Sequence, residues 1–467
     1  MIHHTIRRVG FALGVAAWVA APFAYAQDAG PLQLSPAQMQ EAAKLAAQSG
    51  DMARAVAFAD ALLTRDPQDV NAHLIRAYAL RAQGRYAPAQ EAARSAWRLA
   101  GSAEQKYNAA LVMAQALSSD GKRTRAQFWL RRAVEHAPSP GHARRATRDF
   151  KYVRQRNPWQ THLSFTLAPN SNINNGSSRD SFLSDSVLDR LVGGGPTVRE
   201  INPEAQALSG IEIGGQVQSR YRFAQSERRA HDLRLGLSYR TYALSQDSKD
   251  QVPDARGRDY AFGSASIGYG FKHLRADRRG ELSLGVDLGQ TFYGGARYAS
   301  FLRGHADQSY FVDQRTKLRF GLVAEVENGQ RVSDSESVSV SFGVDRALSG
   351  GSGVHLGLTV ADQKSPNALH EYSLVRLRGG YLLGREVMGA QVQIGLGAAL
   401  RDYDVHLLSV DGRRDVEISF DVTATFRDID YYGFTPQVSL TGAKTNSNIG
   451  VYDSNRLGLN IGIVSAF

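Results

Sequence analysis

The longest pattern in the chain is an alternation of hydrophobic and polar residues that starts near residue 159 and continues to residue 467. Successive side chains of a β-strand point to opposite faces of a sheet, so a period of two predicts strands with one apolar face. Fourteen such stretches follow one another, and the least well defined lies near residues 308–312. The others are centred on residues 163–167, 211–223, 233–239, 261–271, 282–288, 318–326, 338–344, 354–360, 375–383, 392–400, 416–426, 434–440 and 457–463.

The polar positions between these apolar residues are often charged, as at Arg234, Asp287 and Glu325. A soluble sheet of this size needs a second apolar layer, which these positions do not supply. A transmembrane barrel instead combines an apolar outer surface with a hydrated lumen, and single-chain bacterial barrels have an even number of strands. We therefore predict a 14-stranded antiparallel transmembrane β-barrel over residues 158–467.

The connections between the predicted strands alternate in length, as expected for a barrel with short periplasmic turns and longer outer loops. The short connections lie near residues 224–231, 272–280, 348–353, 384–390 and 428–433. The mostly longer ones lie near residues 170–205, 243–258, 294–306, 328–336, 362–371, 402–414 and 443–455. This asymmetry predicts that the segment preceding the barrel lies in the periplasm.

The last predicted strand is similar to the terminal insertion signal of bacterial outer-membrane barrels. Asn460, Gly462 and Phe467 match that signal, whereas Ser465 departs from it. An apolar strand at the end of a soluble sheet would be an unprotected edge, but in a closed barrel it pairs with the first strand. We expect this strand to be recognised by the barrel-assembly machinery and inserted among outer-membrane lipids.

A second pattern, alanine-rich and helical, occupies residues 36–138 and repeats. Gly50, Gly84 and Gly121 are each followed five residues later by an alanine and seventeen residues later by proline or glycine; these partners are Ala55, Ala89, Ala126, Pro67, Gly101 and Pro138. The first two units are 34 residues apart, which is the period of tetratricopeptide (TPR) repeats. We expect large side chains to fill the space between the helices, and these are Phe58, Leu62, Tyr78, Tyr86, Trp97, Tyr107, Phe128 and Trp129. We predict a TPR-like domain over residues 27–157, a class that binds peptides or proteins.

The first 26 residues have the order of a secretory signal peptide, with a basic start, an apolar middle and a small-residue cleavage site. Ala24 and Ala26 form the Ala-x-Ala site before Gln27. We therefore expect export, and the chain contains no cysteine that could carry a lipid anchor.

The chain of 467 residues has a formal net charge of +10 and no cysteines, which excludes disulfides and thiolate metal sites. The positive charge suits lipid phosphates, or simply a basic surface without a dedicated ligand. A basic segment over residues 144–156 has the same two interpretations, a collar facing anionic headgroups or a solvated helix face. Nucleic acid is not an expected partner of an exported protein.

No motif for catalysis, nucleotide binding or metal binding is recognised. The sequence lacks a Gly-Lys-Ser/Thr phosphate loop, a His-Glu-x-x-His helix and a Gly-x-Ser-x-Gly elbow. The twelve histidines are scattered along the chain. We therefore expect neither an enzyme nor a cofactor.

One tetrapeptide, Asn-Ser-Asn-Ile, occurs twice. In a closed 14-stranded barrel the first copy follows the first strand and the second precedes the last strand, so both would lie at the outer rim beside the closing seam. The candidate seam or gate residues are Asn170, Ser171, Asn172, Asn174, Asn446, Ser447, Asn448 and Tyr452. The alternative is ordinary turn chemistry, because Asn and Ser bond readily to their own backbone.

These motifs, together with Asn157-Pro158-Trp159 and the TPR-like segment, resemble the surface lipoprotein assembly modulator (Slam) family of outer-membrane translocons in the type XI secretion system. The resemblance implies a barrel that moves lipoproteins, or soluble haem- and metal-capture proteins, to the cell surface. It also implies that the periplasmic repeats help to hand over the client, with periplasmic chaperones as further partners.

Two other functions are compatible with the same architecture. A TPR-barrel exopolysaccharide exporter would suit an arginine-rich lumen, although such proteins usually carry longer repeat arrays. A passive outer-membrane porin would need only the barrel.

Overall fold

The computed structural model of the chain describes residues 33–429 and 434–465. The predicted signal peptide with Ala24, Ala26 and Gln27 lies outside the described residues, and so does Phe467 of the predicted insertion signal. Within the described ranges, no helix combines the length and hydrophobicity needed to cross a membrane.

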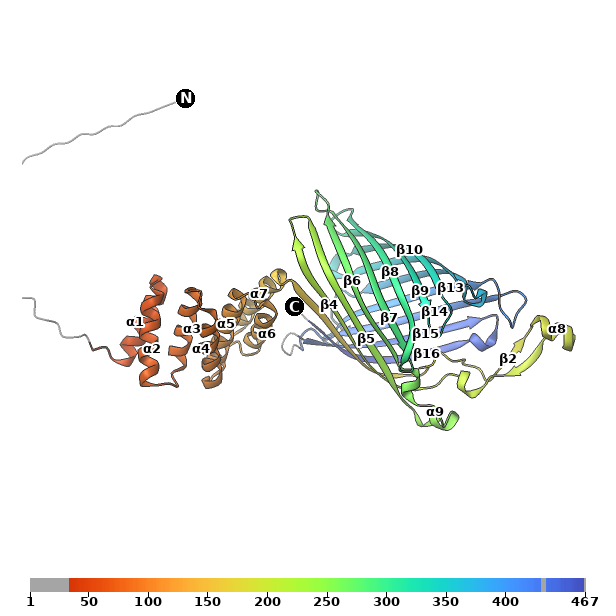
Figure 1. Cartoon of the computed structure of the whole chain (residues 1–467), viewed down its shortest axis with the longest axis horizontal. Coiled ribbons are helices and arrows are strands. Elements are labelled where there is room, and N and C mark those ends of the chain that lie inside the picture. Colours follow the sequence, from red (N-terminus) through yellow and green to blue (C-terminus); the bar gives the residue numbers. More distant parts are fainter. Residues whose placement is uncertain (1–32, 430–433, 466–467) are drawn as a thin grey trace, which may run out of the picture.

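Seven helices of the described chain precede the first strand and lie side by side in a row (Figure 1). They are α1 (Pro36–Ser49), α2 (Met52–Arg65), α3 (Val70–Ala82), α4 (Tyr86–Leu99), α5 (Ala103–Ser119), α6 (Arg123–Glu135) and α7 (Pro140–Arg156). Serine side chains cap the start of α1, α5 and α7, and two of them, Ser35 and Ser102, form capping boxes with Gln38 and Gln105. The region is TPR-like, and α7 extends it to the start of the barrel.

The repeat glycines lie in the turns inside the helix pairs α1–α2, α3–α4 and α5–α6. Gly50, Gly84 and Gly121 have φ values of 89°, 76° and 75°, a left-handed conformation that glycine adopts at little cost. Pro67 and Pro138 follow the ends of α2 and α6, and Gly101 separates α4 from α5. The glycines therefore reverse the chain, while proline or glycine separates one pair from the next.

Small side chains let the paired helices approach closely. Ala55, Ala89 and Ala126 near the start of each second helix have no exposed surface, and Phe150 of α7 is buried in the same cluster as Ala126. The prediction that Tyr78 and Phe128 also pack inside is wrong, because they are 38% and 56% exposed. The repeat pattern alone could not distinguish these exposed positions from buried ones.

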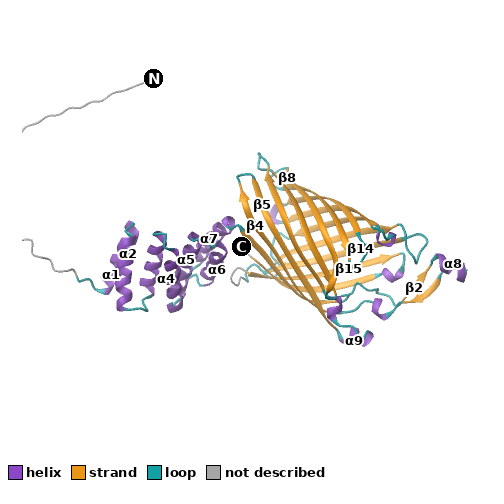
Figure 2. Ribbon diagram, viewed as in Figure 1, coloured by secondary structure: helices purple, strands orange, loops and turns teal. Residues whose placement is uncertain are grey.

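Fourteen strands of the described chain form a closed antiparallel barrel (Figure 2). Each strand pairs with its neighbours in sequence, and β1 closes the barrel by lying between β4 and β16. The bounds are β1 (Trp159–Asn170), β4 (Gly210–Gln225), β5 (Arg229–Leu244), β6 (Phe262–Leu274), β7 (Gly280–Tyr293), β8 (Ala296–Phe311), β9 (Thr316–Gly329), β10 (Ser335–Ala347), β11 (Gly353–Lys364), β12 (Tyr372–Leu382), β13 (Gln391–Tyr403), β14 (Arg413–Thr425), β15 (Phe434–Ser447) and β16 (Ser454–Ser465). The predicted strand number and topology are confirmed.

The sequence prediction is wrong for the sixth barrel strand. A short strand near residues 308–312 and a long loop over 294–306 were expected, but β8 is sixteen residues long and begins directly after a tight turn at Gly294 and Gly295. Both glycines have positive φ, as two-residue hairpin turns require. The outward positions of β8 after Leu302 are Gly304, Ala306, Gln308 and Tyr310. These residues are too small or polar to give an apolar stripe.

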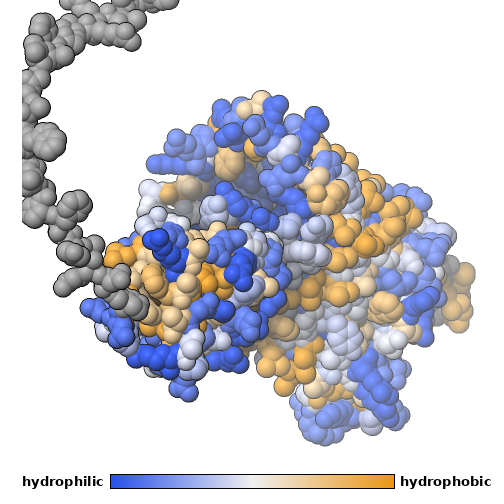
Figure 3. Space-filling view, turned by 60° about the vertical axis from the view of Figure 1, so that its left-hand side comes forward, coloured by the Kyte–Doolittle hydropathy of each residue, from blue (hydrophilic) through white to orange (hydrophobic). Residues whose placement is uncertain are grey.

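The barrel wall has the two faces that the alternation predicts. Leu163, Phe165 and Leu167 of β1 are about half exposed on the outer face. Charged residues on the inner face pair across strands, as Arg222 does with Asp232 at 2.8 Å. Figure 3 shows hydrophobic residues gathered on the barrel wall. The helix α9 (Gln246–Gln251) follows β5.

The two ends of the barrel differ in what connects the strands. The end near the helices carries turns such as 226–228, 275–279 and 312–315. The opposite end carries the longest insertion, residues 171–209, which contains β2 (Ser181–Ser184), α8 (Val187–Gly193), β3 (Thr197–Glu200) and the 3-10 turn η1 (Pro203–Ala205). Figure 1 shows this insertion projecting beyond the strands, away from the helical region. We call this the outer end.

Candidate functional site: the barrel seam

The barrel closes between its first and last strands, and this interface is the least paired one in the described barrel. β1 and β16 register at only two positions, Leu167 with Ile461 and Asn170 with Gly458. The same β1 registers with β4 along all twelve of its residues. β1 is thus bonded along its whole length to β4 and only sparsely to β16. Opening the barrel between β1 and β16 would break the fewest ladder bonds.

The residues of the seam explain part of this sparse pairing. Pro169 of β1 has no N–H to donate to a ladder, and proline is confined to weakly paired positions in sheets. Gly458 and Gly462 of β16 carry no side chain and lie against the β1 backbone, where a Cβ would meet the carbonyl oxygens of Pro169 and Phe165. The seam therefore lacks one backbone donor, at Pro169, and two of its β16 positions contribute no side chain to cross-strand packing.

The first Asn-Ser-Asn-Ile copy continues the seam above the last registered pair. The Ser171 N–H donates to the Leu457 carbonyl at 3.1 Å, and the Leu457 N–H donates to Ser171 Oγ at 2.8 Å. Asn172 is 1% exposed and its Nδ2 donates to the carbonyls of Gly176 and Asn455. Serine and asparagine side chains thus replace the missing ladder bonds at the outer rim.

Asn170 of this copy and Asn174, the second residue after Asn172, bond within the barrel and the insertion. Asn170 Nδ2 donates to Glu212 on the neighbouring β4 at 3.2 Å. Asn174 Nδ2 donates to the Glu204 and Gln206 carbonyls, and its Oδ1 accepts from the Leu208 N–H at 3.0 Å. Asn174 therefore holds the two ends of the 171–209 insertion together.

The second copy lies at the end of β15 and bonds toward β14 rather than across the seam. Asn448 Oδ1 accepts from the Arg414 N–H at 2.7 Å, and its Nδ2 donates to the Gly412 carbonyl. Asn446 pairs with Val416 in the ladder, and Ser447 Oγ caps the Ile449 N–H. These residues shape the turn η5 (Gly450–Tyr452) that leads into β16.

Tyr452 joins η5 to the loop 404–412. Its hydroxyl lies 2.9 Å from His406 Nε2, and the Arg413 guanidinium lies 3.3 Å from the centre of its ring. Burial, followed by the nearby positive charge of Arg413, lowers the pKa of His406. The neutral imidazole is therefore the form that this contact favours.

The two copies are connected by residues that the sequence did not single out as gate candidates. The Ser178 N–H donates to the Asp453 carbonyl at 2.7 Å, Ser177 Oγ donates to the Gly450 carbonyl, and the Arg179 guanidinium forms an ion pair with the buried Asp453 carboxylate. We call this set, Ser177, Ser178, Arg179, Gly450 and Asp453, the clasp. Arg179 and Asp453 are separated by 274 residues, so only the closed barrel brings them together.

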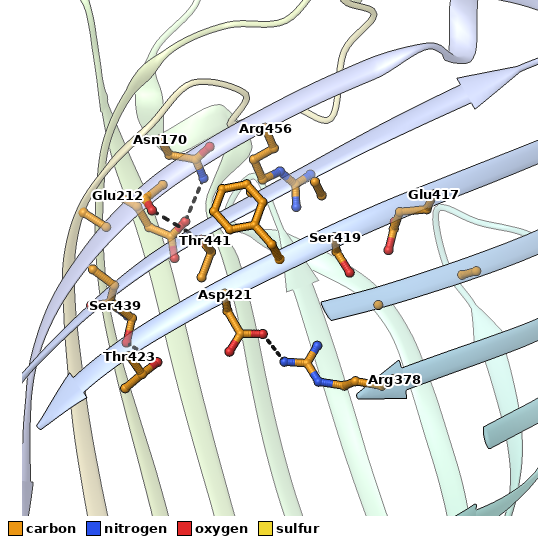
Figure 4. Close-up of a pocket in the computed structure, with 18 of the residues that line it drawn as sticks. Asn170, Glu212, Arg378, Glu417, Ser419, Asp421, Thr423, Ser439, Thr441 and Arg456 are labelled. Atoms are coloured by element: carbon orange, nitrogen blue, oxygen red, sulfur yellow. Dashed lines mark hydrogen bonds and ion pairs between the residues drawn. The ribbon is translucent and has the colours of Figure 1, made fainter. Parts of the chain in front are cut away.

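A cavity of about 690 Å³ lies on the lumen side of the seam (Figure 4). Its wall comes from β1, β4 and β12–β16, and its charged side chains are three acids and three arginines: Glu212, Glu417, Asp421, Arg376, Arg378 and Arg456. Arg378 pairs with Asp421, as the dashed line in Figure 4 marks. Thr423 and Ser439 lie 3.0 Å apart through their hydroxyl oxygens. This wall is polar, offers hydrogen-bonding groups and is balanced in charge.

A second lumen cavity, of about 320 Å³, lies on the other side of β1 against β4–β8. Arg234, Asp287 and His305 meet there, with Arg234 Nη1 2.6 Å from His305 Nε2 and Arg234 Nη2 3.5 Å from Asp287. These groups satisfy one another across strands β5, β7 and β8. Such pairing holds strands in register and leaves neither sign of charge free to retain a passing molecule strongly.

The residues of the predicted insertion signal are only partly described. Asn460 and Gly462 lie in β16, opposite Ser439 and Gln437 of β15. Asn460 Oδ1 is buried with no hydrogen-bond partner among the described residues. Their role as a signal stays a prediction.

The sequence profile of the family described as "Surface lipoprotein assembly modifier" matches residues 159–461. The search of curated proteins finds no match. Among solved structures, the chaperone SycD of the Yersinia enterocolitica type III secretion translocator is 20% identical, with 27% of this chain and 88% of that chain covered and a TM-score of 0.24. An outer-membrane channel from Pseudomonas putida is 12% identical, and the match covers 65% of this chain and 95% of the channel with a TM-score of 0.32. An anion-selective porin from Comamonas acidovorans is 9% identical, and the match covers 66% of this chain and 100% of the porin with a TM-score of 0.29.

Proposed function

Because the chain belongs to the surface lipoprotein assembly modifier family, whose profile spans its outer-membrane barrel, we propose that it is a translocon that carries lipoproteins to the cell surface. The observation that carries the proposal is the sparse β1–β16 pairing. An opening there would connect the hydrated lumen with the outer leaflet sideways, so that a polypeptide could pass through the lumen while its acyl anchor stays in lipid.

The lumen wall behind the seam supports passage of a polypeptide. Three acids and three arginines line the cavity, so a client of either charge meets both attraction and repulsion. Hydroxyl groups of Thr423, Ser439 and Thr441 supply hydrogen bonds that exchange readily with water. The transport role requires no catalytic group.

The helical region is proposed to receive the client in the periplasm. It joins the barrel through β1 at the end with the turns 226–228 and 275–279, and Figure 1 shows it beyond that end. Its exposed large side chains are Leu45, Tyr78, Leu99, Phe128 and Tyr152. Apolar and aromatic groups of this kind can hold an unfolded client released by a periplasmic chaperone.

The client class follows from the family description, which names lipoproteins. Soluble haem- or metal-capture proteins are a second class, proposed from the resemblance alone. Co-expression of the chain with one representative of each class, followed by surface labelling, tests the two separately.

The proposal is tested by deleting residues 33–157 while keeping the leader and the barrel. We expect the shortened barrel to insert, which its heat-modifiable migration reports, while surface labelling of a co-expressed lipoprotein is lost. Unchanged labelling would show that the helices are not needed for transport. A large, stable single-channel conductance of the full chain would instead favour a passive porin.

A further inference from the structure

The projection formed by residues 181–200, which we call the finger, has a polar interior. The buried Asp189 carboxylate accepts hydrogen bonds from Ser184 Oγ at 2.5 Å, Ser186 Oγ at 2.6 Å, Thr197 Oγ1 at 2.8 Å and Arg199 Nη2 at 2.7 Å. Ser184 has no exposed surface and Asp189 is 5% exposed. One carboxylate therefore ties β2, α8 and β3 into a fixed shape.

The outside of the finger is aliphatic. Leu183 of β2 and Val198 of β3 are directly opposite one another, which places them on the same face of the hairpin, and they are 59% and 75% exposed. Leu188, Leu191 and Val192 of α8 have the i, i+3, i+4 spacing of one helix face and are 62%, 78% and 81% exposed. This arrangement, polar inside and apolar outside, is the reverse of an ordinary soluble element.

The finger contacts a second outer loop through its backbone. The Asp185 N–H donates to the Leu408 carbonyl at 3.2 Å, and Asp185 forms a parallel bridge with Ser409. The loop 404–412 exposes Val405 and Leu407, which are 50% and 71% exposed. Two segments more than two hundred residues apart thus touch at the outer end, and each exposes aliphatic side chains there.

The charges of the finger argue against a lipid surface as the partner. Segments that dock on anionic headgroups present free lysine or arginine. Here Arg179 pairs with Asp453, Arg190 with Asp185 and Arg199 with Asp189. Residues 179–200 contain no lysine and carry three arginines against four acids.

The finger is rooted beside the seam, because the clasp bonds residues 177–179, just before the finger, to Gly450 of η5 and to Asp453, the residue before β16. A client that leaves through the seam passes this root before it folds, while its nonpolar segments are still exposed. We propose that the finger and the loop 404–412 form an outer docking surface for nonpolar segments of the exported polypeptide. This inference rests on the proposed transport function and adds a binding site outside the membrane.

The test uses the full chain in lipid nanodiscs with a benzophenone amino acid at Val192. The probe is reduced, carboxymethylated α-lactalbumin, which stays unfolded, and the native form of the same protein is the control ligand. We expect cross-links to the unfolded probe and none to the folded one. The same cross-linker at Lys249, an exposed position of α9, should give none with either.

Two double variants separate a contact from a folding defect. Leu188→Asp with Leu191→Asp should weaken probe binding by roughly tenfold or more, because the apolar area of two side chains no longer contributes. Leu188→Ile with Leu191→Ile keeps the aliphatic surface and should bind as the parent does. Equal binding by both variants would overturn the proposal, whatever their stability.

The remaining outcomes of the cross-linking experiment also test the proposed docking surface. Cross-links from Val192 to lipid alone would make the finger a membrane contact, and cross-links only to a second copy would make it an assembly surface; each overturns the proposal. If lipoprotein display in cells depends on the chain but no unfolded probe cross-links, the docking surface is refuted and transport stands. If display does not depend on the chain, the transport proposal itself fails.

Discussion

A disulfide across the seam would test whether the barrel opens there. The chain has no native cysteine, so an engineered pair is the only one possible. Leu167 and Ile461 are registered partners across the seam, and Leu167 and Ile213 are registered partners across the β1–β4 interface. Directly opposed residues in antiparallel strands are close enough to form a disulfide. The variants Leu167→Cys/Ile461→Cys and Leu167→Cys/Ile213→Cys therefore share one cysteine and differ only in which side of β1 they lock.

The magnitude follows from what holds each side of β1. The seam has two registered pairs and, at the rim, two hydrogen bonds between Ser171 and Leu457 and one from Asn172 Nδ2 to the Asn455 carbonyl. At roughly 0.5–1.5 kcal/mol for each of these five interactions, opening it costs on the order of 2.5–7.5 kcal/mol. The twelve registered pairs of the β1–β4 side correspond to roughly 6–18 kcal/mol on the same scale. Separating β1 from β16 therefore costs much less free energy than separating β1 from β4.

The assay is surface labelling of a co-expressed lipoprotein after oxidation and again after reduction. We expect display to fall in proportion to the fraction of chain cross-linked at 167–461 and to recover when the disulfide is reduced. The 167–213 pair should leave display unchanged, because that interface stays closed during transport. All three side chains face lipid and are about half exposed, so the substitutions do not alter the lumen. Full display from the oxidised seam variant would refute the idea that transport requires the seam to open.

Three further predictions concern the helical turns and the outer rim. Gly84→Ala places a Cβ on a residue with φ of 76° and should lower the free energy of unfolding of the helices by about 1–2 kcal/mol. The helical circular dichroism of the full chain in urea measures this change. Gly101→Ala should leave the free energy of unfolding unchanged, since Gly101 is outside the left-handed region. Equal effects of the two substitutions would count against the turn assignment. Because the pKa of His406 is lowered in the folded rim, the protonated ring is disfavoured there. The loop 404–412 should therefore have its full stability above a pH of about 6.5 and become less stable as the pH falls below that value. We expect faster proteolysis of this loop at acidic pH, and His406→Gln should abolish that pH dependence. A pH-independent cleavage rate in the parent would contradict this. Asp453→Asn removes the ion pair to Arg179, whose guanidinium is partly exposed, and should loosen the insertion by about 1–2 kcal/mol, seen as faster cleavage within residues 180–200. Asp180→Asn, which changes an exposed acid outside the clasp, should leave that cleavage rate as it is.

The sequence predicted the barrel well because lipid imposes a strict rule on every strand. Outward residues such as Phe165 and Leu440 must be apolar, and inward residues such as Asp421 are free to be charged, so the period of two is visible without a structure. Most of β8 was not predicted, because its outward residues Gly304 and Ala306 can face lipid without being strongly hydrophobic. The start of β8 was not predicted either, because Gly294 and Gly295 form a turn that is shorter than the expected outer loop.

The candidate site was less predictable from the sequence, because it depends on contacts that only closure creates. The repeated Asn-Ser-Asn-Ile motif pointed to the rim, and the first copy does bond across the seam through Ser171 and Asn172. The second copy bonds mainly to Arg414 and Gly412 instead. No local pattern marks Arg179 as the partner of Asp453, and none distinguishes the two registered pairs of the seam from the long ladders beside it.

The most direct test of the transport function is protease treatment of intact cells that express a lipoprotein together with the chain or without it. We predict that the protease digests the lipoprotein only in cells that contain the chain, while a periplasmic marker stays intact in both. A lipoprotein that is digested equally without the chain, or protected equally with it, would contradict the transport function proposed here.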